Sequence, residues 1–211
     1  SAGMMDRKAV ADSRYVDRAR AIATIGDSTV VMGGTFQDSC YFQDTVNYRI
    51  TGFEDDIFIS SYSDTAAFRW VQQGGSKAID QLNALVTDPQ GNIYFAGAFD
   101  SAFVMGGQTL LGAAHLDGFV GKLDVNGNLL WLKRIGGSGF DVARDVRLTN
   151  SGDILVTGYF QADVDLGGGF SLELEDTMDQ NAYVVRMDPA GNTLWAQNLG
   201  GSGPDLGVAV D

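Results

Sequence analysis

The sequence predicts an all-β fold assembled from repeated units, and three observations lead to this prediction. The tryptophans recur at spacings of 61 and 64 residues, at Trp70, Trp131 and Trp195. Glycine is abundant, at 28 residues, and proline is scarce, at 3, which suits many tight turns between short strands. No segment shows a sustained helical period of apolar residues. Because a fixed period determines architecture, the repeat is analysed first.

Two further markers recur with each tryptophan. A double glycine follows a few residues later: Gly74-Gly75, Gly136-Gly137 and Gly200-Gly201. An aspartate then begins a short apolar run: Asp17, Asp80, Asp141 and Asp205. The markers divide the chain into an N-terminal segment, three full repeats of about 61–64 residues, and the opening strand of a fourth: 1–16, 17–79, 80–140, 141–204 and 205–211. The N-terminal segment stands where the closing strand of a preceding unit is expected.

Within the middle repeat, turn chemistry and strand propensity predict each element in order. The expected elements are an opening strand, a turn, a strand, a hairpin, an alternating strand, a second turn and a closing strand: 80–86, 88–92, 93–99, 103–111, 118–124, 126–127 and 128–135. Proline and glycine favour the first turn, Gly106-Gly107 favours the hairpin, and Asn126-Gly127 favours the second turn. The glycines after the closing strand are expected to break it.

Four core strands per unit, repeated with glycine turns, are typical of a β-propeller blade. The additional Gly-Gly hairpin accounts for the unusual length of the unit. One blade cannot bury both of its faces, so neighbouring blades must stack. We therefore expect the tryptophans to be buried between sheets rather than to stack on a ligand. Three blades do not close a ring, so the sequence predicts an open or fragmentary propeller.

Several of these pieces resemble the bacterial β-propeller family known as SBBP repeats. The matching residues are Gly136-Gly137 with Asp141, the turn and strand at 88–94, the step Gly97-Ala98-Phe99, and the strand at 117–120. The resemblance extends from about Asp17 onward and implies an exported bacterial module, extracellular or on the cell surface. Residues 188–195 are also similar to the closing motif of quinoprotein-type propellers, which is structural and brings no quinone site.

Composition limits the classes of partner. The chain carries 14 Lys and Arg against 27 Asp and Glu, a formal net charge of −13. This acidic balance argues against nucleic acid and anionic membranes as partners. No apolar stretch approaches the length of a membrane span. The single cysteine, Cys40, allows no intrachain disulfide and is expected to be a buried small hydrophobe. The single histidine, His115, is expected on a surface loop.

Two sets of oxygen-bearing residues raise the question of a metal. Asp124, Asn126 and Asn128 stand at the first, third and fifth positions of a calcium-like loop, but the twelfth position is Ile135 and the equivalent turn has Ala190 at its third. A strand turn needs the same residue types for backbone reasons, so we expect no metal there. The recurrent aspartates either cap turns by accepting backbone N–H groups or ring an axial opening and attract a cation. Their presence in every repeat favours capping.

Motifs for catalysis are missing from the sequence. There is no Ser/His/Asp set, and Gly167-Gly168-Gly169 opens a strand rather than a helix, so it is no phosphate loop. Carboxylates are numerous enough that a glycosidase-like pair stays open. The sequence favours a non-enzymatic binding scaffold or subunit of a surface assembly, without cofactor and with a protein or glycan ligand. The alternative is an enzyme of glycan or polyanion processing with its site on the blade-loop face.

The ends of the chain lead to a last expectation. Residues 205–211 reproduce an opening strand, with alternating apolar residues at Leu206, Val208 and Val210. Apolar side chains and backbone groups of such a strand need partners. We expect it to pair with residues 9–15 or, more readily, with another copy of the chain, because an unpaired β edge is a template for joining molecules.

Overall fold

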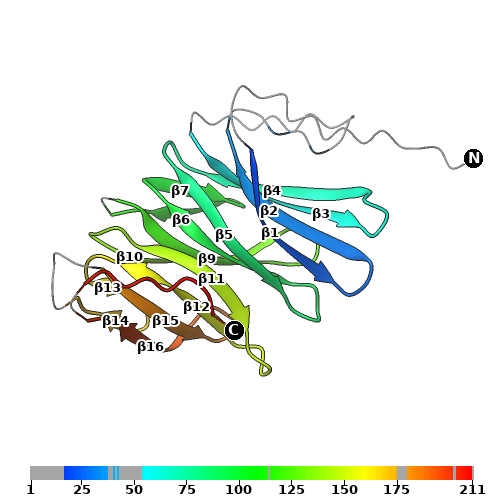
Figure 1. Cartoon of the computed structure of the whole chain (residues 1–211). Helices are drawn as coiled ribbons and strands as arrows, with labels where there is room; N and C mark the ends of the chain where they lie inside the picture. Colours follow the sequence, from blue (N-terminus) through cyan, green and yellow to red (C-terminus); the bar gives the residue numbers. More distant parts are fainter. Residues whose placement is uncertain are drawn as a thin grey trace, which may run out of the picture.

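The structure is a computed structural model that describes residues 17–37, 40, 42, 54–113, 115–174, 180–201 and 203–210. The regular elements in these residues are sixteen β-strands, paired in antiparallel sheets. Three sheets stack side by side and do not close on one another (Figure 1). The predicted all-β fold of propeller blades is therefore confirmed, in an open arrangement. Within the described ranges no helix is long and apolar enough to cross a membrane.

Each blade has four core strands, and the sheets of two blades are extended by a hairpin. Blade 1 contains β1 (Arg18–Ile25), β2 (Thr29–Phe36), β3 (Asp56–Ser63) and β4 (Phe68–Gly75). Blade 2 contains β5 (Asp80–Thr87), β6 (Ile93–Phe99), β9 (Asp117–Leu123) and β10 (Leu129–Gly137). Blade 3 contains β11 (Val142–Leu148), β12 (Ile154–Phe160), β15 (Asn181–Met187) and β16 (Thr193–Leu199). The hairpins are β7 (Ala102–Met105) with β8 (Gln108–Leu111), and β13 (Val164–Asp165) with β14 (Ser171–Leu172).

The elements of the middle repeat agree with the sequence predictions, with one correction at the double glycine. Gly106 and Gly107 have positive φ values of 54° and 81° and form the predicted hairpin turn. Gly136 and Gly137, however, do not break the closing strand, because β10 continues through Gly137. These glycines remain in the strand since another strand pairs with them.

That partner strand comes from the next repeat, which the sequence did not predict. The hairpin β7–β8 follows β6 in the chain but pairs with β4 of blade 1, through Gly74 with Met105 and Gly75 with Val104. The hairpin β13–β14 pairs in the same way with β10 of blade 2. Each hairpin thus extends the sheet of the preceding blade, and the blades are joined by backbone hydrogen bonds as well as by side-chain packing.

Apolar side chains fill the spaces between blades. The space between blades 1 and 2 is filled from both sides by buried aliphatic and aromatic residues: Val31, Ile57, Ile59, Phe95, Phe99 and Phe119. The space between blades 2 and 3 is filled likewise: Tyr94, Ala96, Val120, Val146, Val156 and Tyr183. Every residue of β6 is buried, since blade 2 is covered on both faces. A smaller cluster in blade 1 contains Phe36 and Phe58, and Cys40 packs against it while only partly buried.

Residues 205–210 differ from the strand predicted for them. They form no regular strand, yet they lie along blade 3 in the place where β5 and β11 lie along the preceding blades (Figure 1). The Asp205 amide donates to Gln180 O at 2.8 Å, as the Asp80 amide donates to Asp55 O and the Asp141 amide to Leu116 O. The predicted partner at 9–15, and the whole N-terminal segment 1–16, lie outside the described residues.

Candidate functional site

The recurrent aspartates bind the backbone where each blade begins. The carboxylate Oδ2 of Asp80 accepts a hydrogen bond from the Ser76 amide at 2.5 Å, and Oδ2 of Asp141 accepts one from the Gly137 amide at 2.6 Å. Asp205 accepts from the Gly201 amide at 2.9 Å, and Asp17 Oδ1 from the Gln37 amide at 3.4 Å. For three of the four aspartates, Asp80, Asp141 and Asp205, the donor lies four residues before the aspartate. This repeated geometry supports the capping hypothesis.

A second row of polar side chains lies beside the closing strands. Asp56, Asp117 and Asn181 are buried at equivalent places, at the start of the third core strand of each blade. Each touches a glycine five residues after the recurrent tryptophan, and a Cβ on Gly75, Gly136 or Gly200 would overlap its carboxyl or amide group. This close contact explains why one residue of each double glycine must be glycine. It also shows that the double glycine of the first repeat is shifted by one position, because Ser76 there matches Gly137 and Gly201.

Burial raises the pKa values of several of these carboxyls toward neutrality. Desolvation raises the pKa of Asp80 to about 8, against hydrogen bonds from Ser76, and the neighbouring Asp56 raises it further. Desolvation also raises the pKa of Asp56 to about 7, against the Gln73 hydrogen bond. The pKa of Asp141 rises to about 6, again chiefly by burial. Carboxyls with such values suit acid–base chemistry. Asp80 is fully buried, and Asp56, although it borders a cavity described below, is only 3% exposed.

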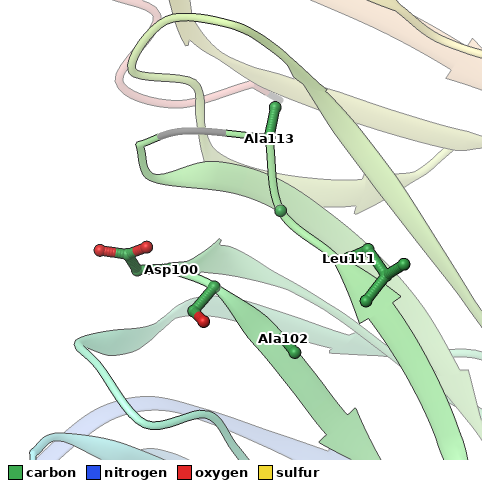
Figure 2. A pocket seen from close by; sticks show the side chains of 6 residues that line it. Asp100, Ala102, Leu111 and Ala113 are labelled. Carbon is green, nitrogen blue, oxygen red and sulfur yellow. The ribbon is translucent and has the colours of Figure 1, made fainter.

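An open cavity lies at the base of the hairpin β7–β8. It has a volume of about 360 Å³, and its lining is Asp100, Ser101, Ala102, Leu111, Gly112 and Ala113. In Figure 2 the Asp100 carboxylate stands at one side of the cavity and the Leu111 side chain at the other. The Ser101 carbonyl accepts a hydrogen bond from the Gly112 amide at 2.7 Å, which fixes the two ends of the hairpin. The cavity thus combines one carboxylate, one hydroxyl and apolar surface.

Asp117, from the second row of polar side chains, fixes the backbone beside this cavity. The Ala113 amide donates to Asp117 Oδ2 at 2.8 Å, and Arg134 Nη1 lies 3.4 Å from the other carboxylate oxygen. Two residues beyond Ala113, the His115 ring stacks on the Phe140 ring, with centroids 4.6 Å apart and planes at 16°. His115 is exposed as the sequence predicts, and Phe140 is 43% exposed. Sequence reasoning missed this pair because nothing in one repeat shows that two loops meet.

A second cavity lies where β4 meets β7. It has a volume of about 310 Å³ and is lined by Asp56, Gln73, Gly75, Ser76, Val104, Met105 and Gly106. Each of the two cavities therefore has a single carboxylate in its lining. Among the residues that the structure describes, no three His, Cys, Asp or Glu side chains lie together as metal ligands do.

The calcium-like turn is occupied by its own hydrogen bonds. Asp124 Oδ1 accepts from the amides of Asn126 and Asn128, both at 2.8 Å, and Oδ2 accepts from Asn128 Nδ2. The turn at Asp188 has the same bonds from Ala190 and Asn192. In this geometry the aspartate and the asparagines shape the backbone of the turn.

The tryptophans join one blade to the turn of the next. Trp70 Nε1 donates to Val125 O at 3.1 Å, and Trp131 Nε1 donates to Pro189 O at 3.3 Å. Both indoles are partly buried, but Trp195 is 40% exposed. The prediction that all three are buried between sheets is therefore wrong. The indole needs the turn of a following blade to cover it, and within the described residues no such turn lies against Trp195.

Comparisons with known proteins add limited information. No family model matches the chain. The chain is 28% identical to an uncharacterised WD repeat-containing protein, L264, of Acanthamoeba polyphaga mimivirus, over 60% of this chain and 10% of that protein. It thus spans about a tenth of the length of this relative. WD repeats build propeller blades, in agreement with the fold described above.

Among solved structures, the chain is similar to BamB from Moraxella catarrhalis. The identity is 16% and the TM-score 0.22, and the match covers 88% of this chain and 78% of that one. A score this low carries no argument. The three blades are therefore established by their own strand pairing.

Proposed function

We propose that this chain is a non-enzymatic binding scaffold whose ligand docks at the hairpin cavity, defined by Asp100, Ser101, Ala102, Leu111, Gly112 and Ala113. The observation that supports this most directly is the separation of accessible groups from acid–base groups. Asp80 and Asp56, the carboxyls whose pKa values are raised most, are only 0% and 3% exposed, whereas the hairpin cavity presents one carboxylate beside polar and apolar groups. Hydrolysis of a glycan needs two carboxyls on either side of one bond. This arrangement favours binding over turnover.

The surface around the cavity has the chemistry of a protein-binding site. Leu111 is 71% exposed and Val104, on the same hairpin, is 48% exposed. Exposed apolar side chains beside polar groups are typical of interaction surfaces. The formal net charge of −13 favours a ligand that carries positive charge, because it attracts such a ligand over a distance. A glycan ligand would instead use the flat His115–Phe140 pair next to the cavity.

The proposal includes an exported setting, extracellular or on a bacterial cell surface. Its support is the resemblance to SBBP repeats at 88–94, 97–99 and 117–120. Fractionation of cells that express the parent gene, with detection of this chain in culture medium or surface fractions, tests this part separately.

Chemical-shift mapping tests the binding role. A lysine-rich peptide and a set of neutral oligosaccharides are titrated into the ¹⁵N-labelled chain, and the amides of Ser101, Gly112 and Ala113 are followed. We expect saturable shifts at these amides with the peptide, lost in Asp100→Asn and kept in Thr109→Ala, which is exposed on the same hairpin but does not line the cavity.

The other outcomes of this titration distinguish the competing functions. Shifts with an oligosaccharide alone make the ligand a glycan. Release of shortened sugars during the titration makes the chain an enzyme and overturns the proposal. Shifts that avoid the cavity with every probe refute the cavity as the binding site.

A further inference from the structure

Blades 1 and 2 differ in what accompanies the buried carboxylate beside the closing strand. Gln73 of blade 1 and Arg134 of blade 2 occupy equivalent places in the strand register. The Arg134 guanidinium lies 3.4 Å from the Asp117 carboxylate, whereas the neutral Gln73 side chain donates to Asp56 at 3.2 Å. Blade 3 has an amide side chain at both places: Asn181 and Asn198. Blade 1 therefore keeps the buried carboxylate of blade 2 and lacks the guanidinium that accompanies it.

The missing guanidinium changes the electrostatics of the junction between blades 1 and 2. At the junction of blades 2 and 3, burial raises the pKa of Asp141 to about 6, and Arg134 is among the groups that act against this rise. At the first junction burial raises the pKa of Asp56 to about 7 and that of Asp80 to about 8, and a neighbouring carboxylate raises each further. The groups that act against these two rises are uncharged hydrogen-bond donors. Among the described residues, no cationic side chain pairs with Asp56 or Asp80.

Asp56 has an unused hydrogen-bond acceptor at the second cavity, where β4 meets β7. Its Oδ1 has no hydrogen-bond partner within the part of the chain that the structure describes, although the residue is only 3% exposed. Asp56 borders the cavity of about 310 Å³ together with Gln73, Val104 and Met105. The Gln73 side chain is only partly buried, so it can turn aside and open the carboxylate to the cavity. A buried acceptor without a donor is unfavourable, so a donor that enters this cavity is stabilised.

A guanidinium group has the geometry that this carboxylate lacks. Its planar fork of N–H donors bonds both oxygens of a carboxylate, so it can replace the single bond from Gln73 at Oδ2 and supply the absent bond at Oδ1. The methylene stem of an arginine can cover Val104, which is 48% exposed, and the adjacent apolar lining. An ammonium is a strongly hydrated point charge and matches the two oxygens less well. The formal net charge of −13 attracts a cationic partner over a distance.

We propose that the second cavity receives an arginine side chain of a partner protein, whose guanidinium binds Asp56 as Arg134 binds Asp117. Blade 2 carries its own arginine at this place, and blade 1 takes one from a partner. The assignment goes beyond the ligand site at the hairpin cavity, because it uses a different carboxylate and selects one side chain. Either site can fail without the other.

Titration with matched peptides tests the proposal. Gly-Arg-Gly, Gly-Lys-Gly and the neutral citrulline analogue, each with blocked ends, and guanidinium chloride are titrated into the ¹⁵N-labelled chain at pH 8. The amides of Gly75, Ser76 and Gly106, which line the second cavity, are followed. We expect saturable shifts with the arginine peptide and binding at least about tenfold weaker with citrulline, which has the same shape without the charge. The lysine peptide and free guanidinium, which lack the fork and the stem respectively, are expected to bind more weakly than the arginine peptide.

Three variants separate the carboxylate from its surroundings. Asp56→Asn removes the charge, and Gln73→Arg supplies a guanidinium within the chain, an arrangement that blade 2 already accommodates. Both are expected to weaken the arginine peptide at least about tenfold. Gln73→Ala removes only the competing neutral bond and is expected to keep the affinity or increase it. Because Gln73→Arg reproduces the pairing of blade 2, it tests the site even if Asp56→Asn does not fold.

Four results would overturn the proposal. The first is equal binding of the arginine and citrulline peptides, and the second is unchanged affinity in Gln73→Arg. The third is a lysine peptide or free guanidinium that binds as tightly as the arginine peptide, which makes the cavity a general cation site. The fourth is a set of shifts confined to Ser101, Gly112 and Ala113, which supports the hairpin cavity and leaves the second cavity without a ligand.

Discussion

Blade 2 and blade 3 carry the same motif on their closing strands, but the two tryptophans differ in environment. Trp131 donates to Pro189 O and packs with the core between blades, while Trp195 is 40% exposed. Ile135 is fully buried and its counterpart Leu199 is 49% exposed. The residue types match, so the difference arises from the neighbouring blade. In a protein of stacked repeats, whether a motif residue is buried depends on two neighbouring units rather than on one.

The largest expected effect is the contrast between the two tryptophans. Trp131→Ala removes a partly buried indole and leaves a void under the 188–192 turn, so we expect a loss of about 3 kcal/mol in the free energy of unfolding. Trp195→Ala removes an exposed indole and is expected to cost less than about 1 kcal/mol. Denaturant titration of both variants measures the difference. Equal costs would mean that burial does not separate the two sites.

A smaller effect is expected at the turn glycines. Gly127 and Gly152 both have positive φ, at 83° and 86°, but only Gly127 lies under an indole. Gly152→Ala should cost about 1 kcal/mol through backbone strain alone. Gly127→Ala adds the overlap with the Trp70 ring, and we expect about 2 kcal/mol in all. Thermal unfolding measures the stability of both variants, and the difference between them is the contribution of the junction contact. Equal stabilities would mean that the contact with the Trp70 ring contributes nothing.

The sequence predicted the strands of a blade well, and the contacts between blades poorly. Strand ranges such as 93–99 follow from local rules of turn and propensity, which one repeat contains in full. The pairing of β7 with β4 depends on where the preceding blade lies, and no local rule contains that. The double glycine illustrates the limit. Local rules favour a strand break there, whereas Gly136 and Gly137 stay in β10 because the hairpin of the following repeat pairs with them.

The candidate site was less predictable than the fold. The recurrent aspartates can be recognised in the sequence because they repeat, and repetition marks residues that build the architecture. Asp100, Leu111 and Phe140 do not recur as a pattern, so no periodicity identified them. Positions that differ among repeats are where a repeat-built scaffold is free to place a ligand site.

The blades also differ in how many titratable carboxyls they bury, and pH can sharpen this comparison. Blades 1 and 2 contribute Asp56 and Asp80, with pKa values raised to about 7 and about 8. Blade 3 contributes Asp141, with a pKa raised to about 6, and has Asn181, which cannot titrate, at the position of Asp56. A raised pKa means that the folded chain binds more protons than the unfolded chain between about pH 4 and pH 8. Stability is therefore expected to fall as the pH rises through this range.

Thermal melting at several pH values measures this dependence. Asp80→Asn removes the titrating group with the largest value and should flatten the fall, whereas Thr109→Ala should leave the slope unchanged. A melting temperature that rises from pH 5 to pH 8 in the unaltered chain would contradict the raised values.

The smallest effect is expected from metal removal, because the aspartates of the two junction turns already accept hydrogen bonds from within their own turns. Asp124 at the junction of blades 1 and 2 and Asp188 at the junction of blades 2 and 3 each accept two backbone amides and one asparagine side chain. These hydrogen bonds lower the pKa of Asp188, the Asn192 bonds contributing most, so the carboxylate stays ionised and bonded without a cation. A chelator should therefore leave the melting temperature of the chain unchanged, and Asn126→Ala should respond to the chelator no differently. A fall in melting temperature on chelation that calcium reverses, and that Asn126→Ala abolishes, would instead establish a cation at the 124–128 turn and make one junction metal-dependent.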